Sequence, residues 1–185
     1  MHVVSTIDDI CWTLNIRGND IDFFPLVLSY GIITMDSFEL YIDERKLDDK
    51  LKAELAKDGV NLHPYNDIYE DVKKFGSDVV AMIDPGKLNY ALFNNIPENV
   101  KTVEKRNPAI LMKAIKNPVE IENIRKAQIK DSVAHVRFMK WLKENVGKMR
   151  ITEMSASDKL DEFRAEMGNF IRPSFEPISS FGEHG

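Results

Sequence analysis

Residues 116–145 read KNPVEIENIRKAQIKDSVAHVRFMKWLKEN and form the longest helical pattern in the chain. Asn117 is a favourable N-cap, Pro118 suits the first helical position, and Glu120 adds negative charge to the first turn. No further glycine or proline follows before Gly147, the type of residue at which helices commonly end. The pattern therefore predicts one long helix that begins after Asn117 and ends near Gly147.

Apolar side chains occupy a broad arc of this predicted helix, and charged side chains occupy the opposite face. The apolar positions are Ile121, Ile124, Ile129, Val133, Val136, Phe138, Met139, Leu142 and Val146. An arc of this width predicts a helix that is packed on more than one side, as a spine between two layers.

The composition is that of a soluble globular protein, with 43% hydrophobic and 30% charged residues among 185. A net charge of -5 argues against nucleic acid or an anionic membrane as the main partner. The single cysteine, Cys11, excludes an internal disulfide or a CxxC metal site, and we expect it to be a buried small hydrophobe. No run is long enough to span a bilayer and no secretory signal follows Met1, so we expect a cytoplasmic protein.

The charge is unevenly distributed along the chain. Residues 1–106 carry 19 acidic and 12 basic side chains, whereas residues 107–185 carry 11 and 13. The change falls at Asn107-Pro108, where a proline also interrupts the pattern. We therefore predict two parts, residues 1–107 and residues 108–185.

The first part alternates between short apolar strands and amphipathic helices. Expected strands are 2–6, 26–34, 38–43, 60–65, 78–84 and 99–105; expected helices are 8–15, 46–59, 66–76 and 87–96. Such alternation predicts an α/β domain with three layers. Because 26–34 and 38–43 form a hairpin around a short turn, the central sheet should be mixed rather than purely parallel.

The second part has fewer elements. Residues 108–115 are helical or irregular, a helix capped by Thr152 runs to Gly168, and residues 170–185 resemble the opening of a strand. Two helices and half a hairpin cannot enclose a core. We expect this part to be the beginning of a larger, truncated domain, with exposed apolar surface that favours self-association or a swapped arrangement.

Residues suited to catalysis do not cluster in the sequence. His2, His63, His135 and His184 are far apart, and there is no HExxH or CxxC motif. A ligand or base role is conceivable for His135, but a semi-buried histidine paired with Asp131 is favoured. His63 is expected to be structural, and His184 to be incidental.

The remaining polar groups also favour structural roles. Ser179-Ser180 lacks a nucleophile elbow, Asp8-Asp9 should cap a helix, and Asp48-Asp49 should lie on a solvated face. Arg17 could bridge to another domain, but a local salt bridge to Asp20 is favoured. We therefore predict no catalytic, substrate-binding or metal-binding residue in this chain.

Three stretches together resemble one family. IDDICWTLNIRGNDIDFFPLVLSYGIIT (7–34), IKNPVEIENIRKAQIKDSVAHVRFMKWL (115–142) and ITEMSASDKLDEFRAEMGNFIRPSFEPISSFGEHG (151–185) resemble the long, three-domain Xaa-Pro aminopeptidases (aminopeptidase P) of the creatinase/prolidase superfamily, metallopeptidase family M24. The similarity is nearly collinear over the whole chain. It departs from the usual pattern at Cys11, Phe24 and Gln128.

This resemblance implies a fold and an activity. Residues 1–107 would be the second creatinase N-terminal-like domain, of the ribonuclease H-like type, and residues 108–185 the linker and first helices of an incomplete pita-bread catalytic domain. The family removes the N-terminal residue from peptides with proline in second position, using two divalent metals, usually Mn²⁺, that activate a bridging hydroxide. The family is often dimeric, so the resemblance implies a homodimer.

The resemblance also implies that the catalytic groups lie outside this chain. The family's metal ligands, two Asp, one His and two Glu, lie beyond the ISSFGEHG stretch, and His184 does not match the substrate-binding histidine. We therefore expect the chain alone to be inactive and to bind no metal. An alternative is a non-catalytic peptidase-like module that binds protein or peptide. A nucleotide-binding α/β domain is disfavoured because no Gly-rich strand–helix turn is present.

Overall fold

The computed structural model describes all 185 residues, and its contacts divide them into two compact units. The first unit comprises Met1–Ile21 and Pro25–Ile115, and the second comprises Asp22–Phe24 and Lys116–Gly185. Residues 108–115 therefore share their contacts with the first unit. The division expected at residue 107 stays a prediction about domain organisation.

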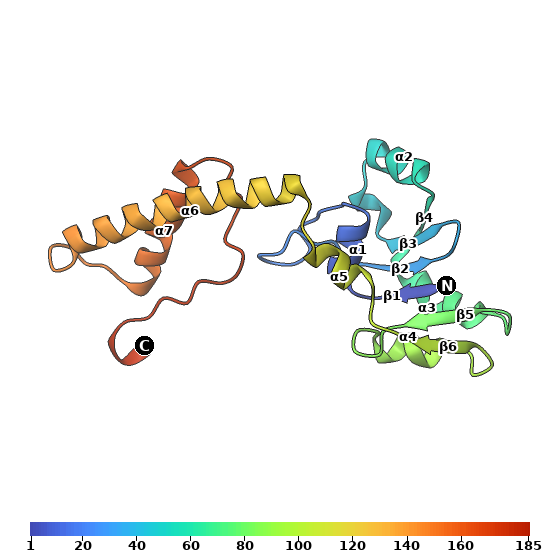
Figure 1. Cartoon of the computed structure of the whole chain (residues 1–185). Helices are drawn as coiled ribbons and strands as arrows, with labels where there is room; N and C mark the ends of the chain where they lie inside the picture. The colour runs from blue at the N-terminus through green and yellow to red at the C-terminus, as the bar shows by residue number, and fades with distance from the viewer. The chain divides into compact units, whose positions relative to one another are not determined.

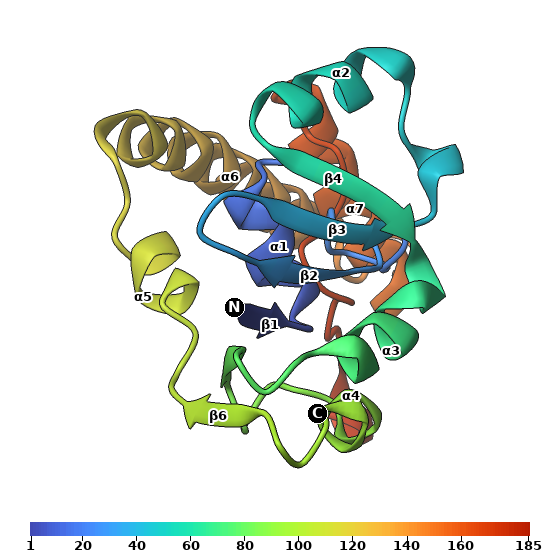
Figure 2. The same cartoon turned by 90° about the vertical axis from the view of Figure 1, so that its right-hand side faces the viewer.

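A six-stranded mixed sheet forms the centre of the first unit, in the order β4-β3-β2-β1-β5-β6. The order can be followed in Figure 1, and Figure 2 shows β4, β3, β2, β1 and β6 from another side. The strands are β1 (His2–Val4), β2 (Ser29–Ile33), β3 (Phe38–Ile42), β4 (Val60–Pro64), β5 (Val80–Ile83) and β6 (Lys101–Glu104). The β1–β2 and β2–β3 pairs are antiparallel, and the other three pairs are parallel. The predicted hairpin and the predicted mixed sheet are both confirmed.

Five α-helices connect the strands of this unit or follow them. They are α1 (Ile7–Thr13), α2 (Asp49–Lys57), α3 (Ile68–Asp71), α4 (Tyr90–Asn95) and α5 (Ala109–Ala114). The single helix expected over residues 66–76 is wrong in detail. Single turns of 3-10 helix, η2 (Tyr65–Asp67) and η3 (Val72–Lys74), flank the short α3. These tighter turns suit a short connection and still bury Ile68 and Val72 completely.

Two hydrophobic cores lie on opposite faces of the sheet. Alternate residues of β3 divide between them, because successive side chains of a strand point to opposite faces. Leu40 packs with α1 and α2 in one core, and Tyr41 packs with α3 and α4 in the other. Helices thus cover both faces (Figure 1), and the predicted three-layer α/β architecture is confirmed.

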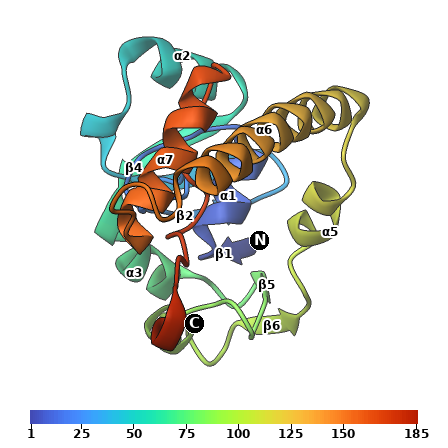
Figure 3. The ribbon, with the colours of Figure 1, turned by 90° about the vertical axis from the view of Figure 1, so that its left-hand side faces the viewer.

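The second unit contains α6 (Pro118–Asn145), α7 (Glu153–Glu166) and the 3-10 turn η4 (Gly182–His184). Figures 1 and 3 show α6 and α7 side by side. Asn117 and Thr152 cap these helices as predicted, each within a capping box. Gly147 and Gly168, which follow the helices, have positive φ angles of 80° and 74°. The strongest local signals in the sequence therefore located both helices.

Two expectations for the second unit are wrong. α6 is not packed on more than one side, because Ala134 is its only buried residue. Residues 170–185 form no strand, since no neighbouring strand provides partners for their backbone groups. None of the helices is both long enough and apolar enough to cross a lipid bilayer.

The cap of α6 provides a direct test of its local stability. Asn117 Oδ1 accepts a hydrogen bond from the Glu120 amide at 2.9 Å, and Glu120 Oε2 accepts one from the Asn117 amide at 2.8 Å. Asn117→Ala removes the first bond and should destabilise the helix end by about 0.5–2 kcal/mol. Hydrogen exchange should accelerate in the amides of residues 119–122. Gln128→Ala, in the middle of α6, is the control, and equal exchange at the helix end in both variants would contradict the prediction.

Candidate functional site

The RGND turn, residues 17–20, is the most distinctive polar segment of the first unit. Arg17 Nη1 donates hydrogen bonds to the carbonyl oxygens of Cys11 and Ile16, at 3.0 and 2.8 Å. The expected Arg17–Asp20 salt bridge is therefore wrong. The Cys11 carbonyl near the end of α1 also accepts a hydrogen bond from the Ile16 amide at 3.0 Å, so the guanidinium group adds a second bond to it.

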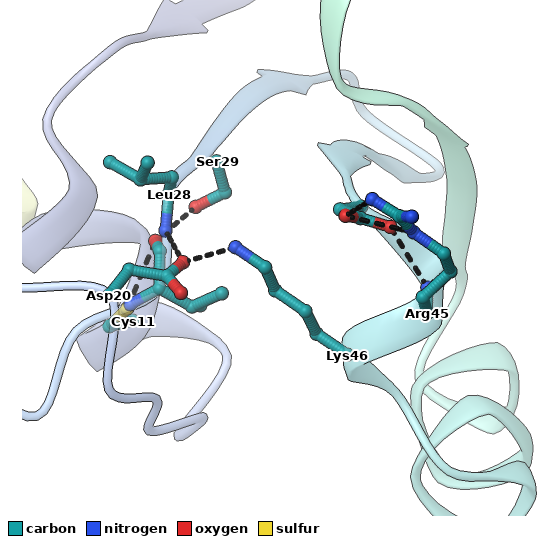
Figure 4. Close-up of polar contacts among 8 residues, drawn as sticks. Cys11, Asp20, Leu28, Ser29, Arg45 and Lys46 are labelled. Atoms are coloured by element: carbon teal, nitrogen blue, oxygen red, sulfur yellow. Dashed lines mark hydrogen bonds and ion pairs between the residues drawn. The ribbon is translucent and has the colours of Figure 1, made fainter.

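Asp20 instead joins three segments of the first unit, as Figure 4 shows. Its Oδ2 accepts a hydrogen bond from the Leu28 amide at 2.7 Å and lies 2.5 Å from Lys46 Nζ. The hydrogen bond from Lys46 lowers the pKa of Asp20, which partial burial opposes and the Leu28 amide reinforces. Asp20 thus anchors the turn to the start of β2 and to the 3-10 turn η1 (Glu44–Lys46).

Cys11 lies beside this turn but has no exposed reactive group. Its side chain is buried, and its Sγ accepts a hydrogen bond from the Val27 amide at 3.4 Å. Burial raises the pKa of the thiol, so the nucleophilic thiolate is disfavoured. The prediction of a buried small hydrophobe is confirmed.

An open pocket of about 520 Å³ lies where the parallel strands β3 and β4 end. Its lining residues are Leu28, Ile42, Asp43, Glu44, Lys46, Pro64, Tyr65, Asn66 and Asp67. Arg45 hydrogen bonds to Asp43 and lowers the pKa of that carboxyl group to about 2. Lys46 is already paired with Asp20. The pocket thus presents the ionised carboxylate of Asp43 and no activated nucleophile.

The four histidines lie in different elements of secondary structure, and no two of them share a partner. His2 is buried in β1, and burial lowers its pKa. His63 Nε2 lies 2.6 Å from Glu39 Oε2 on neighbouring strands. His135 Nδ1 lies 3.0 Å from the Asp131 carbonyl oxygen, one helical turn away, which confirms the predicted partner. The expectation that His135 is semi-buried is wrong, because its side chain is 47% exposed. His184 Nδ1 lies 3.0 Å from Glu153 Oε1.

The acidic pairs do not form a metal site. Asp8 and Asp9 are not the N-cap of α1, as the sequence had suggested, because that position is Thr6. Asp48 caps α2, and its side chain accepts a hydrogen bond from the Leu51 amide. No group of three or more His, Cys, Asp or Glu side chains is arranged to hold a metal ion. The assignment of no catalytic, substrate-binding or metal-binding residue stays a prediction.

Glu39 provides a test of the polar network on the sheet. Its carboxylate accepts hydrogen bonds from Ser37 at 2.5 Å and Asn61 at 2.9 Å, and it contacts His63. Burial alone would raise the pKa of Glu39, but the three hydrogen bonds outweigh it and lower the pKa below 4.5. Its contribution to stability is therefore present above pH 4.5 and is lost as the pH falls through the lowered pKa.

Glu39→Gln should consequently lower the free energy of unfolding by about 1 kcal/mol at neutral pH. The difference from the unsubstituted protein should shrink as the pH falls below 4.5. Thermal unfolding followed by circular dichroism between pH 3 and pH 7 measures both effects. A difference that stays constant across this range would show that the charge of Glu39 contributes nothing.

Comparison with protein families matches the two parts of the chain to two domain families. Residues 1–120 match the Creatinase/Prolidase N-terminal domain, and residues 122–185 match Metallopeptidase family M24. The probable Xaa-Pro aminopeptidase P of Neurospora crassa is 36% identical over 99% of this chain. Xaa-Pro aminopeptidase 1 of Dictyostelium discoideum is 38% identical over 100% of it. The chain spans 28% and 30% of these two relatives.

Solved structures give the same relationship. The X-prolyl aminopeptidase of Caenorhabditis elegans, described as a cytosolic enzyme with a di-nuclear active site, is 32% identical with a TM-score of 0.90. The match covers 97% of this chain and 30% of that enzyme. The Xaa-Pro dipeptidase of Bacillus anthracis, at 16% identity and a TM-score of 0.63, shares the fold.

Proposed function

Since the chain belongs to the Xaa-Pro aminopeptidase P family, we propose that it is part of a metal-dependent peptidase that removes the N-terminal residue from peptides with proline in second position. The observation that carries the proposal is the collinear match, in which both domain families occur in order over nearly the whole chain. In this reaction water hydrolyses the peptide bond before proline. The carbonyl carbon gains the hydroxyl group of the water, the bond from that carbon to the proline nitrogen breaks, and the nitrogen gains a proton.

The residues of this chain do not fit the metal centre of such an enzyme. They contain no group of three suitable ligands, and the histidines are paired separately with Glu39, Asp131 or Glu153, or buried. In our proposal, residues outside this chain hold two divalent metal ions, which the resemblance to the family implies are Mn²⁺. This chain contributes the N-terminal domain and the first helices of the M24 domain.

The decisive test has two arms. Calorimetric titration of this chain with Mn²⁺ should show no binding, and the chain should not hydrolyse an Xaa-Pro peptide. The complete product of the gene that encodes it should hydrolyse the same peptide, and a chelator should abolish that activity. A complete product without activity at any metal concentration would support a non-catalytic peptide-binding module instead. Micromolar binding of Mn²⁺ by this chain would contradict our assignment of the ligands.

We further propose that the complete protein works in the cytoplasm as a homodimer. The supporting observations are the related cytosolic enzyme and the exposed apolar side chains of α6, among them Ile129 and Val136. Sedimentation at several concentrations tests the association. A monomer at every concentration would refute the homodimer.

A further inference from the structure

A buried carboxylate links the two ends of the first unit's sequence. Asp9, in α1, is only 1% exposed. Its Oδ2 accepts hydrogen bonds from Thr6 Oγ1 at 2.6 Å and from Asn107 Nδ2 at 2.9 Å, and its Oδ1 lies 2.5 Å from Lys113 Nζ. Lys113 also pairs with Asp8. Asp9 therefore connects α1 with residues about a hundred positions later.

Asn107 extends these contacts to the beginning of α5. Its backbone amide donates a hydrogen bond to Asp84 Oδ2 at 2.8 Å, and its Oδ1 accepts one from the Ala109 amide at 3.1 Å. Asn107 is buried. Asp9 thus reaches both ends of α5, through Asn107 at the start and through Lys113 in the last turn.

The apolar contacts of α5 are weak by comparison. Ala109 is its only buried residue, whereas Leu111 and Met112 are 67% and 59% exposed. A helix of six residues is also too short to be stable by itself. Loss of a hydrogen-bond donor from a buried carboxylate, by contrast, costs much free energy, because it leaves a buried charge uncompensated. The polar contacts of Asp9 are therefore the principal attachment of α5.

The attachment of α5 determines the length of the connection between the first unit and α6. α5 ends at Ala114 and α6 begins at Pro118, so residues 115–117 alone connect the helices. If α5 detached, the connection would start after β6, which ends at Glu104, and would comprise residues 105–117. The reach of the connection would rise from roughly 10 Å to roughly 45 Å.

We propose that Asp9 is a positioning residue which, with Asn107 and Lys113, fastens α5 to the first unit and so keeps the connection to α6 short. This device restricts movement between the N-terminal domain and the part that begins the M24 domain. It requires no ligand, and it does not depend on the proposed peptidase activity.

Hydrogen exchange of the whole chain tests the attachment. Asp9→Asn removes the charge and places an amide group against Lys113, so the amides of residues 109–115 should exchange at least about tenfold faster. The amides of β2 and β3 should not change. Lys113→Met tests the same contact with Asp9 retained, and Lys113→Arg should restore slow exchange. Asp43→Asn, which breaks an exposed pair with Arg45, is the matched control.

Distances between the two units test the consequence. Nitroxide labels on Met35→Cys and Lys140→Cys, both at exposed positions, report a distance distribution by electron paramagnetic resonance. The distribution should broaden in Asp9→Asn and Lys113→Met but not in Asp43→Asn. Unchanged exchange in 109–115, or an unchanged distribution despite faster exchange, would overturn the proposal. If Asp9→Asn accelerates exchange throughout the first unit, the unit has unfolded in that variant. The proposal is then judged by hydrogen exchange and distances in Lys113→Met.

Discussion

Replacing Leu40 by alanine should lower the free energy of unfolding of the first unit by about 2–5 kcal/mol. Leu40 is completely buried in β3, between β2 and β4, where it pairs with Gly31 and Leu62. Removal of its side chain leaves a cavity that the neighbours cannot easily close. Phe38 already packs against Gly31, so closely that a Cβ atom there would lie 2.7 Å from its ring.

Urea unfolding monitored by circular dichroism measures this loss. The midpoint should fall while the dependence of the free energy on urea concentration stays the same, because the surface exposed on unfolding hardly changes. Met35→Ala, at a side chain that is 97% exposed, should change the free energy by less than about 0.5 kcal/mol. A cost below about 1 kcal/mol for Leu40→Ala would indicate that the core repacks around the cavity.

Patterns that act over a few residues predicted most of the fold. The hairpin of β2 and β3, the three layers and the capped helices α6 and α7 all follow from periodicity, caps and turns, which depend on residues close in sequence. The prediction of a strand over residues 170–185 is wrong because a strand depends on contacts outside its own sequence. A strand requires hydrogen-bonding partners, and the local sequence cannot supply them.

Side-chain partners were harder to predict than elements. Arg17 and Asp20 have opposite charges and lie in one turn, yet they bind different groups. Asp9 appeared to be a helix cap, but its partners Asn107 and Lys113 lie about a hundred residues away. No periodicity joins positions at that separation. Only the tertiary structure could reveal that attachment, and the expectation of no metal site still awaits the titration.

The RGND turn also shows that a distinctive motif can mark a fold rather than a chemistry. Arg17 donates hydrogen bonds to the carbonyl oxygens of Cys11, in α1, and of Ile16, beyond it, and Asp20 holds the start of β2 and the turn η1. Neither side chain is directed towards an activated nucleophile or a group of metal ligands. The two charged side chains of this stretch therefore serve the fold of the first unit.

Asp20→Ala should accordingly destabilise the first unit by about 2 kcal/mol, since it removes two hydrogen bonds to a carboxylate whose side chain is 19% exposed. Lys46→Met removes only one of these bonds and should cost less. Lys52→Ala, which removes a looser pair with Glu44, should cost less than about 0.5 kcal/mol. Urea unfolding of the three variants at neutral pH provides the comparison.

The dependence on pH distinguishes the ion pair from loss of packing. Because Lys46 and the Leu28 amide lower the pKa of Asp20 below 3.8, its stabilising effect is present above pH 3.8 and is lost as the pH falls through the lowered pKa. The difference between the unsubstituted protein and Asp20→Ala should therefore shrink in acid. If instead the difference is the same at pH 3 and pH 7, Asp20 acts through packing, and its negative charge does not stabilise the first unit.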